Sequence, residues 1–252
     1  MRLSLTLLLG LTAIPAAADA SDPSALWTIV SGQCVPHEQT ASDPSPCSEV
    51  DLSEGAAKGF AVLKDKRGVA QFLLIPTARI SGIDDPAILA PGATNYWDAA
   101  WQSRYFVEDR LHTPLPRDNV ALAINSADGR TQDQLHIHID CMRPDVRQAI
   151  AANLDKIAAV WTPFPVPLAG HRYRSIRIDQ ETLDGVNPFR ILADKDPHAM
   201  ADMGKQTLVL AGATFAGGNP GFVLLNDQSD PATGDRASGE ELQDHTCSGV
   251  AR

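Results

Sequence analysis

Residues 129–141 of the chain read GRTQDQLHIHIDC. From Leu135 onward, apolar and polar side chains alternate, which is the pattern of a β-strand with one buried face. Because successive side chains of a strand point to opposite faces, every second residue from Leu135 faces a hydrophobic core. The other face then carries two imidazoles and a carboxylate, those of His136, His138 and Asp140. The alternation therefore predicts a polar cluster on one face of a sheet.

Hydrogen-bond donors lead into this strand. Residues 120–124 have the apolar composition of a short strand, and a turn that begins at Asn125 follows them. Arg130, Thr131 and Gln132 come next, so guanidinium, hydroxyl and amide groups stand beside the histidines. These groups suit the binding of a diphosphate. A neutral imidazole can attack phosphorus and form an intermediate that water then cleaves.

Two other interpretations of the histidine pair stay open. Hydrogen bonds alone can satisfy both imidazoles without any function, or the pair can ligate a metal ion. A zinc hydrolase needs a third ligand. Four other histidines are candidates, although none has a diagnostic spacing: His112, His171, His198 and His245.

Aromatic residues at helical spacing follow a buried strand. Residues 69–76 are mostly apolar and end at a proline, which predicts the strand. Trp97, Trp101 and Tyr105 recur every four residues, which predicts a helix over residues 95–107. We expect these rings to pack the helix on a sheet.

The second half of the chain is predicted to be rich in strands. A helix over residues 145–160 is followed by three prolines, which mark a boundary. Strands are predicted over residues 173–178, 206–213 and 221–225. The glycine-rich turn at residues 217–220 joins the last two as a hairpin rather than as a phosphate cradle, because no helix-opening Lys, Ser or Thr follows it.

Charge and the N-terminus limit the possible partners. The formal net charge of −10 gives no general attraction to phosphate backbones, so nucleic acid is not an expected partner. Arg2, an apolar run over residues 3–14 and the small residues 16–20 have the pattern of a signal peptide, residues 1–20. The run is shorter than the ~18 residues that span a bilayer, although a retained anchor stays an alternative. We expect an exported, periplasmic protein, free or associated with the inner membrane.

Four cysteines follow the predicted signal peptide, and an even count in an exported protein predicts disulfides. They can pair in three ways. Cys34 and Cys47 enclose a short Pro- and Ser-rich stretch with no regular period, which favours pairing between these two. Cys141 is then expected to pair with Cys247.

Several stretches resemble known families. Residues 129–141 resemble the signature of the histidine-triad superfamily, and residues 73–83 resemble the strand and loop that precede its helix. The CDP-diacylglycerol pyrophosphatase family is the closer resemblance, and it runs from about residue 27 to residue 247, which is nearly the whole chain after the predicted signal peptide. The stretches that carry it are LLIPTARISGI, LAINSADGRTQDQLHIHIDCMRPDVR, GFVLL and ELQDHTC.

This resemblance implies an α+β fold built on an antiparallel half-barrel sheet with packed helices. It implies a single domain over residues 21–252, with the histidine-triad core at about 55–160 and a C-terminal β-rich part at about 165–247. The family's activity implies an enzyme that hydrolyses the diphosphate bond of CDP-diacylglycerol to CMP and phosphatidate through a covalent CMP-histidine. Because this substrate is a membrane lipid, a membrane surface is an expected partner.

The resemblance also implies a set of binding residues. Asn125, Arg130, Thr131, Gln132 and Lys64 are expected to bind phosphate or ribose. No cofactor or metal is expected, because such donors can neutralise the charge of a diphosphate.

The order of roles along the histidine strand depends on the register of the alignment. Aligning Gln132 on the superfamily glutamine makes His136 the first member and His138 the central nucleophile. Asp140 then takes the third place, where most members have histidine. A register shifted by two residues makes Gln134 the first member and His136 the nucleophile. The spacing from Gln132 favours the first register.

A non-enzymatic interpretation also stays open. A periplasmic protein that binds a nucleotide or a lipid can keep this fold without turnover. Substitution of His138 would then change affinity and abolish no reaction.

Overall fold

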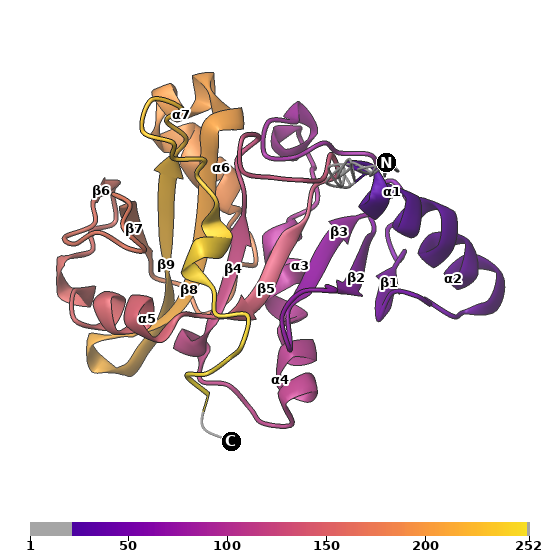
Figure 1. The fold of residues 1–252 in the computed structure, drawn as a ribbon, viewed down its shortest axis with the longest axis horizontal. Helices are drawn as coiled ribbons and strands as arrows, with labels where there is room; N and C mark the ends of the chain where they lie inside the picture. The colour runs from indigo at the N-terminus through magenta and orange to yellow at the C-terminus, as the bar shows by residue number, and fades with distance from the viewer. Residues whose placement is uncertain (1–21, 251–252) are drawn as a thin grey trace, which may run out of the picture.

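The structure, a computed structural model, describes residues 22–250. The predicted signal peptide lies outside this range. Nine strands form one antiparallel sheet, and short helices pack on its faces and at its edges (Figure 1). The predicted α+β class is confirmed. Among residues 22–250, no helix has both the length and the apolar character needed to cross a membrane.

The strands lie in the order β1-β2-β3-β5-β4-β8-β9-β7-β6. Because β4 pairs with β8, the strands of the C-terminal half continue the sheet formed by the first half. The predicted hairpin at residues 217–220 joins β8 to β9. The strands are β1 (Glu49–Asp51), β2 (Phe60–Lys64), β3 (Phe72–Pro76), β4 (Val120–Ile124), β5 (Ile137–Cys141), β6 (Thr162–Pro163), β7 (Arg174–Ile178), β8 (Gln206–Phe215) and β9 (Asn219–Gln228).

The helices are short, and most of them follow a strand or a turn. The α-helices are α1 (Ala25–Ile29), α2 (Val35–Ala41), α3 (Tyr96–Gln102), α4 (Tyr105–Leu111), α5 (Pro144–Ala151), α6 (Pro188–Lys195) and α7 (Pro197–Ala201). A π-helical turn, η1 (Val30–Cys34), joins α1 to α2. The 3-10 turns are η2 (Pro86–Leu89), η3 (Arg117–Asn119), η4 (Leu154–Lys156), η5 (Met203–Lys205), η6 (Ala216–Gly218) and η7 (Gly239–Leu242).

The two faces of the sheet bury different cores. One face joins α3, α4, α6 and α7 in a single large hydrophobic cluster that includes Leu122 and Ile139. The other face carries two separate clusters. Ala123 packs with the α5 side of the molecule, and Leu73 packs under α1. This second face therefore has a gap between two hydrophobic clusters.

The histidine strand lies at the centre of the sheet, between β3 and β4. Its apolar residues, Ile137 and Ile139, belong to the large cluster, as the alternation predicted. His138 pairs with Leu73 on one side and Ala123 on the other, so its ring points into the gap between the two smaller clusters. Regular pairing begins only at Ile137, so His136 lies just before the strand.

Two predicted helices are shorter than expected. The helix over residues 95–107 is divided into α3 and α4. Ser103 donates its hydroxyl to the carbonyl of Ala99, and this local hydrogen bond competes with helix continuation. Trp97 and Trp101 are buried as predicted, but Tyr105 falls after the break and is 45% exposed. The helix predicted over residues 145–160 ends at Ala151.

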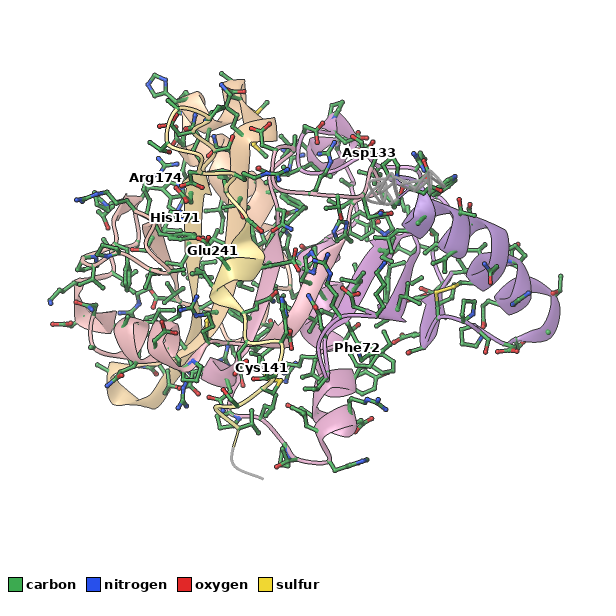
Figure 2. All side chains as sticks on the ribbon, viewed as in Figure 1. Phe72, Asp133, Cys141, His171, Arg174 and Glu241 are labelled. Carbon is green, nitrogen blue, oxygen red and sulfur yellow. A yellow bond between two sulfur atoms is a disulfide. The ribbon has the colours of Figure 1, made fainter. Side chains whose placement is uncertain are left out.

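Both predicted disulfides are confirmed. Cys34 pairs with Cys47 and Cys141 pairs with Cys247, and none of the four cysteines is free. The stretch enclosed by the first bond contains α2, a helix that the sequence did not predict. The second bond closes a separation of 106 residues and attaches the end of the chain to β5. Figure 2 shows Cys141 next to the C-terminal segment.

Candidate active site

A cavity of about 400 Å³ opens at the histidine strand. His136 and His138 line it. The cross-strand neighbours of His138 are Ala123 and Leu73, which belong to the two smaller hydrophobic clusters. The imidazoles therefore occupy the gap between these clusters.

The hydrogen bond of His136 defines its tautomer. Its Nδ1 lies 2.7 Å from the backbone carbonyl oxygen of Gln134. A carbonyl oxygen only accepts, so Nδ1 carries the proton and Nε2 keeps its lone pair. Burial lowers the pKa of His136 below the ordinary value of 6.5, so the ring is neutral near pH 7. A neutral ring with a free Nε2 has the character of a nucleophile.

His138 has the opposite tautomer. Its Nδ1 lies 2.8 Å from the amide nitrogen of Gln71. An amide nitrogen only donates, so Nδ1 accepts and the proton lies on Nε2. Burial lowers the pKa of His138 to about 3, so this ring is also neutral. Among residues 22–250, the buried Nε2 has no hydrogen-bond partner, so its N–H is an unsatisfied donor beside the cavity.

These two tautomers favour the second alignment of the histidine strand, the one shifted by two residues. In that register Gln134 is the first member, and its carbonyl fixes the ring of the central member, His136. The amide of Gln134 donates to the carbonyls of Pro76 and Ala78, at 3.0 and 2.8 Å, which anchors the start of the strand. The two ring centroids lie 4.8 Å apart, close enough for both rings to contact one phosphoryl group.

Glu240 reaches the histidines from near the end of the chain. It lies in η7, and the C-terminal segment, residues 236–247, crosses in front of β8 and β4 (Figure 1, yellow). Its Oε1 accepts from the Asn125 amide at 2.6 Å, and its Oε2 lies 3.3 Å from Nδ1 of His138. Burial opposes ionisation, but hydrogen bonds from the amides of Asn125 and Gln71 lower the pKa of Glu240 below its usual value. A carboxylate therefore stands beside the His138 ring.

Asp140 is absent from the cavity lining. It is fully buried, and its Oδ2 lies 2.7 Å from Nδ1 of His245. This hydrogen bond raises the pKa of His245 above its ordinary value. Nε2 of His245 lies 4.0 Å from Oε2 of Glu240. Asp140 therefore does not line the cavity itself, and it is connected to the cavity through His245 and Glu240.

Most of the predicted binding residues line the cavity: Asn125, Thr131, Gln132 and Lys64. Gln132 also connects the site to α1, because its Oε1 accepts from the backbone N–H of Leu26 at 3.0 Å. The Lys64 ammonium donates to the backbone carbonyls of Asp65 and Gly68, at 2.6 and 3.0 Å. It therefore stabilises the turn between β2 and β3 as well as contributing charge to the cavity.

Arg130, the fifth predicted binding residue, is not among the residues that line the cavity. Its guanidinium pairs with Asp84 and lies 3.4 Å from Asp133. Gly82 packs against this guanidinium so closely that a side chain there would collide with it. The geometry gives Arg130 the role of fixing the loop before the histidine strand.

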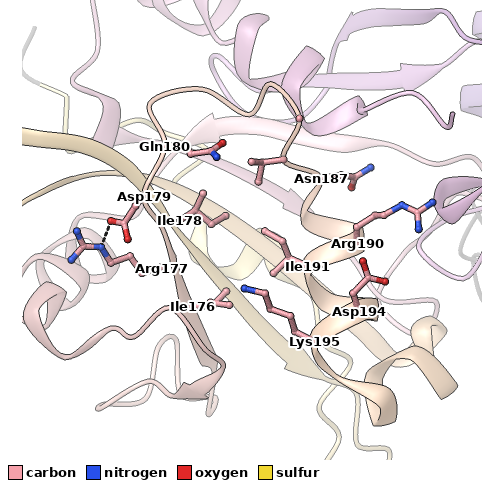
Figure 3. A pocket seen from close by; sticks show the side chains of 12 residues that line it. Ile176, Arg177, Ile178, Asp179, Gln180, Asn187, Arg190, Ile191, Asp194 and Lys195 are labelled. Atoms are coloured by element: carbon pink, nitrogen blue, oxygen red, sulfur yellow. Dashed lines mark hydrogen bonds and ion pairs between the residues drawn. The ribbon is translucent and has the colours of Figure 1, made fainter. Parts of the chain in front are cut away.

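A second cavity, of about 500 Å³, lies between β7 and α6 (Figure 3). Its cations have protein partners. Arg177 pairs with Asp179, and Arg190 donates to the backbone carbonyls of Leu89 and Ala90. It contains no histidine or cysteine. The smaller histidine cavity is therefore the better candidate for a catalytic site.

The metal interpretation needs a third ligand close to the histidine pair. Within residues 22–250, the groups of three or more potential ligand atoms within 4.8 Å of one another do not include His136 or His138. One group contains disulfide-bonded cysteines. The other contains His171 and Glu241, which hydrogen bond at 2.8 Å (Figure 2). The arrangement gives the zinc interpretation no support at the histidine pair.

Sequence reasoning did not identify Gln71 or Glu240 as site residues. Gln71 is a single polar residue in an apolar stretch, yet it is completely buried. Glu240 directly precedes the stretch ELQDHTC that carries part of the family resemblance. That stretch was the only available signal that the C-terminal segment contributes to a site.

Comparisons with known proteins agree with the resemblance. A family model described as CDP-diacylglycerol pyrophosphatase matches residues 21–251. A curated protein of Yersinia pestis, named CDP-diacylglycerol pyrophosphatase, is 46% identical over 227 residues. The alignment covers 90% of this chain and 85% of that protein.

Replacement of Asp140 should lower the pKa of His245. In the unchanged protein the hydrogen bond and charge of Asp140 raise that pKa above 6.5, so His245 is protonated at pH 6.5. In Asp140→Asn the hydrogen bond and the charge of Asp140 are lost while burial of the ring remains, so the pKa of His245 should fall. NMR titration, with the signal assigned by His245→Gln, measures both values. His171, which is paired with Glu241, is the internal control. An unchanged pKa of His245 in Asp140→Asn would contradict the assignment.

Proposed function

The chain belongs to the CDP-diacylglycerol pyrophosphatase family, and we propose that it hydrolyses CDP-diacylglycerol to CMP and phosphatidate at the histidine cavity. The observation that carries the proposal is the pair of neutral imidazoles with opposite tautomers. His136 offers a lone pair to the cavity, whereas His138 offers an N–H. Attack on a phosphoryl group needs both a nucleophile and a donor to the oxygens on which charge develops.

The proposed first step is attack of His136 Nε2 on the phosphorus attached to cytidine. The bond between this phosphorus and the bridging oxygen breaks, and phosphatidate leaves with the bonding electrons. CMP remains on His136 as a phosphoramidate. The Nδ1–H of the ring stays on the Gln134 carbonyl, which stabilises the positive charge that the ring acquires. Water then attacks the same phosphorus, releases CMP and restores neutral His136.

The proposed role of His138 is to donate from Nε2 to a phosphoryl oxygen during both steps. Gln71 fixes this tautomer by donating to Nδ1. Glu240 is a positioning residue, because it holds Asn125 at 2.6 Å and lies 3.4 Å from the Gln71 amide nitrogen. We propose that Asp140 acts on the same network through His245, and that Asn125, Thr131, Gln132 and Lys64 bind the nucleotide and its phosphates.

The cellular setting of the proposed reaction follows from the substrate and the cysteines. CDP-diacylglycerol is a membrane lipid, so the proposed enzyme works at a membrane surface. Two disulfides are typical of an oxidising compartment, which supports the proposal of export to the periplasm.

Zinc catalysis is the rival proposal. Histidine ligands would make activity depend on a tightly bound metal, whereas attack by His136 uses protein groups alone. Exhaustive chelation should therefore leave the rate of CMP release unchanged. Loss of activity that returns on addition of one equivalent of zinc would favour the rival.

Replacement of His136 should abolish the reaction. Purified protein should release CMP and phosphatidate from CDP-diacylglycerol, and His136→Asn should lower kcat by at least roughly a thousandfold, because the nucleophile is lost. His112→Asn is a matched control. His112 is exposed and has a φ of 56°, a conformation that asparagine tolerates. Full activity in His136→Asn would refute the proposal, and equal losses in both variants would show a general defect of folding.

A further inference from the structure

We propose that the apolar wall of the histidine cavity, formed by α1 with the adjacent parts of β2 and β3, binds the acyl chains of the lipid substrate. This inference rests on the proposed function and adds the orientation of the substrate. The nucleotide then lies over β4 and the C-terminal segment, and the lipid lies on the side of α1.

The register of the strands establishes this direction. His138 pairs with Leu73 of β3, and Leu73 pairs with Leu63 of β2. Both leucines line the cavity. His138, Leu73 and Leu63 therefore form a row across β5, β3 and β2 that leads from the imidazole to apolar side chains. Neighbouring strands in such a row are about 4.8 Å apart. On the opposite side of His138 the row continues to Ala123 of β4.

Helix α1 extends this apolar surface beyond the edge of the sheet. Leu26 and Ile29 line the cavity together with Ala25. Leu26 is buried against β2 and β3, whereas Ile29 and Leu63 are only partly buried. Apolar side chains that line a cavity and remain partly exposed offer area for an apolar ligand. The helix is linked to the catalytic loop through the hydrogen bond between Gln132 and Leu26.

The wall on the β4 side has the opposite character. Asn125, Ser238 and Glu240 line it, and they hydrogen bond with one another. An acyl chain on this side would remove these polar groups and the Glu240 carboxylate from water without offering them hydrogen bonds, which is unfavourable. A cytidine with its ribose supplies both donors and acceptors. The difference between the two walls matches the two halves of CDP-diacylglycerol.

Charges on the α1 side fit the leaving group. Lys66 and Arg67 line the cavity from the turn between β2 and β3, and both are exposed. Asp65 of the same turn also lines the cavity, and its carboxylate accepts from the backbone N–H of Arg67 at 3.0 Å. Neither Lys66 nor Arg67 makes an ion pair with another residue of the part that the structure describes. Phosphatidate is an anion with two acyl chains, so cations at the rim of an apolar wall complement it.

The dependence of the rate on acyl length tests this subsite. The substrates are CDP-diacylglycerols whose chains lengthen from butyryl to octanoyl, all in the same detergent. For the unchanged protein, kcat/KM should rise with length by up to roughly fourfold for each methylene that the wall buries. Ile29→Gln and Leu63→Gln should each flatten this rise relative to the unchanged protein.

Thr28→Gln is the matched control, because Thr28 is exposed on the same helix and does not line the cavity. It should keep the full dependence on length. Thermal melts of all variants report on folding, and Leu63→Gln tests the wall independently of α1. Release of CMP with an unchanged length dependence in both wall variants, or an equal loss at every length, would overturn the subsite alone. Failure of the unchanged protein to release CMP from any member would overturn the proposed function and the subsite with it.

Discussion

Two imidazoles lie buried between two hydrophobic clusters on one face of the sheet, and the properties of the site depend on the energetic cost of burying them. Removal of water disfavours the charged form of histidine, so both rings are neutral near pH 7. A buried neutral ring still needs hydrogen-bond partners. His136 obtains one from the backbone of Gln134, two residues earlier, whereas His138 needs the side chain of Gln71, which directly precedes β3. These different partners give the two rings different tautomers and therefore different chemistry.

The C-terminal segment completes the site because it covers the strands that carry the histidines. Gln243 donates to the backbone carbonyls of Ala121 and His138, at 2.8 and 3.2 Å, across β4 and β5. The bond between Cys141 and Cys247 attaches the end of this segment to the histidine strand. Glu240 and His245 are thereby held beside His138 and Asp140, more than 100 residues away in sequence. The cross-link reduces the entropy that the unfolded chain would otherwise gain across this long separation.

Local pattern predicted much of this arrangement. Strict alternation placed the histidines opposite Ile137 and Ile139, and the count and spacing of the cysteines predicted both bonds. The helix break at Ser103 depended on one side-chain hydrogen bond that competes with the helix. Such competition does not change the spacing of apolar residues along the chain, so the sequence pattern did not reveal the break. The helix α2, between Cys34 and Cys47, buries none of its residues, so no apolar period revealed it.

The tautomer of His138 could not be predicted, because its partner Gln71 lies 67 residues away in sequence. Gln71 and Glu240 come close to His138 only in the folded chain, where β3 and η7 lie near β5. The spacing from Gln132 favoured His138 as the nucleophile, but Gln132 reaches the backbone of Leu26 instead of the histidines. Arg130 likewise looked suited to phosphate, yet its guanidinium pairs with Asp84. Spacing along the strand predicted which residues lie together, and their hydrogen bonds are the basis of the roles that we propose for them.

The most direct test of the account identifies the residue that carries the nucleotide during turnover. CDP-diacylglycerol labelled in its cytidylyl phosphate is mixed with the protein, the reaction is quenched rapidly under conditions that preserve phosphoramidates, and the labelled peptide is mapped by mass spectrometry. The account predicts CMP on His136. CMP on His138, or steady release of CMP with no labelled histidine at any time, would contradict it.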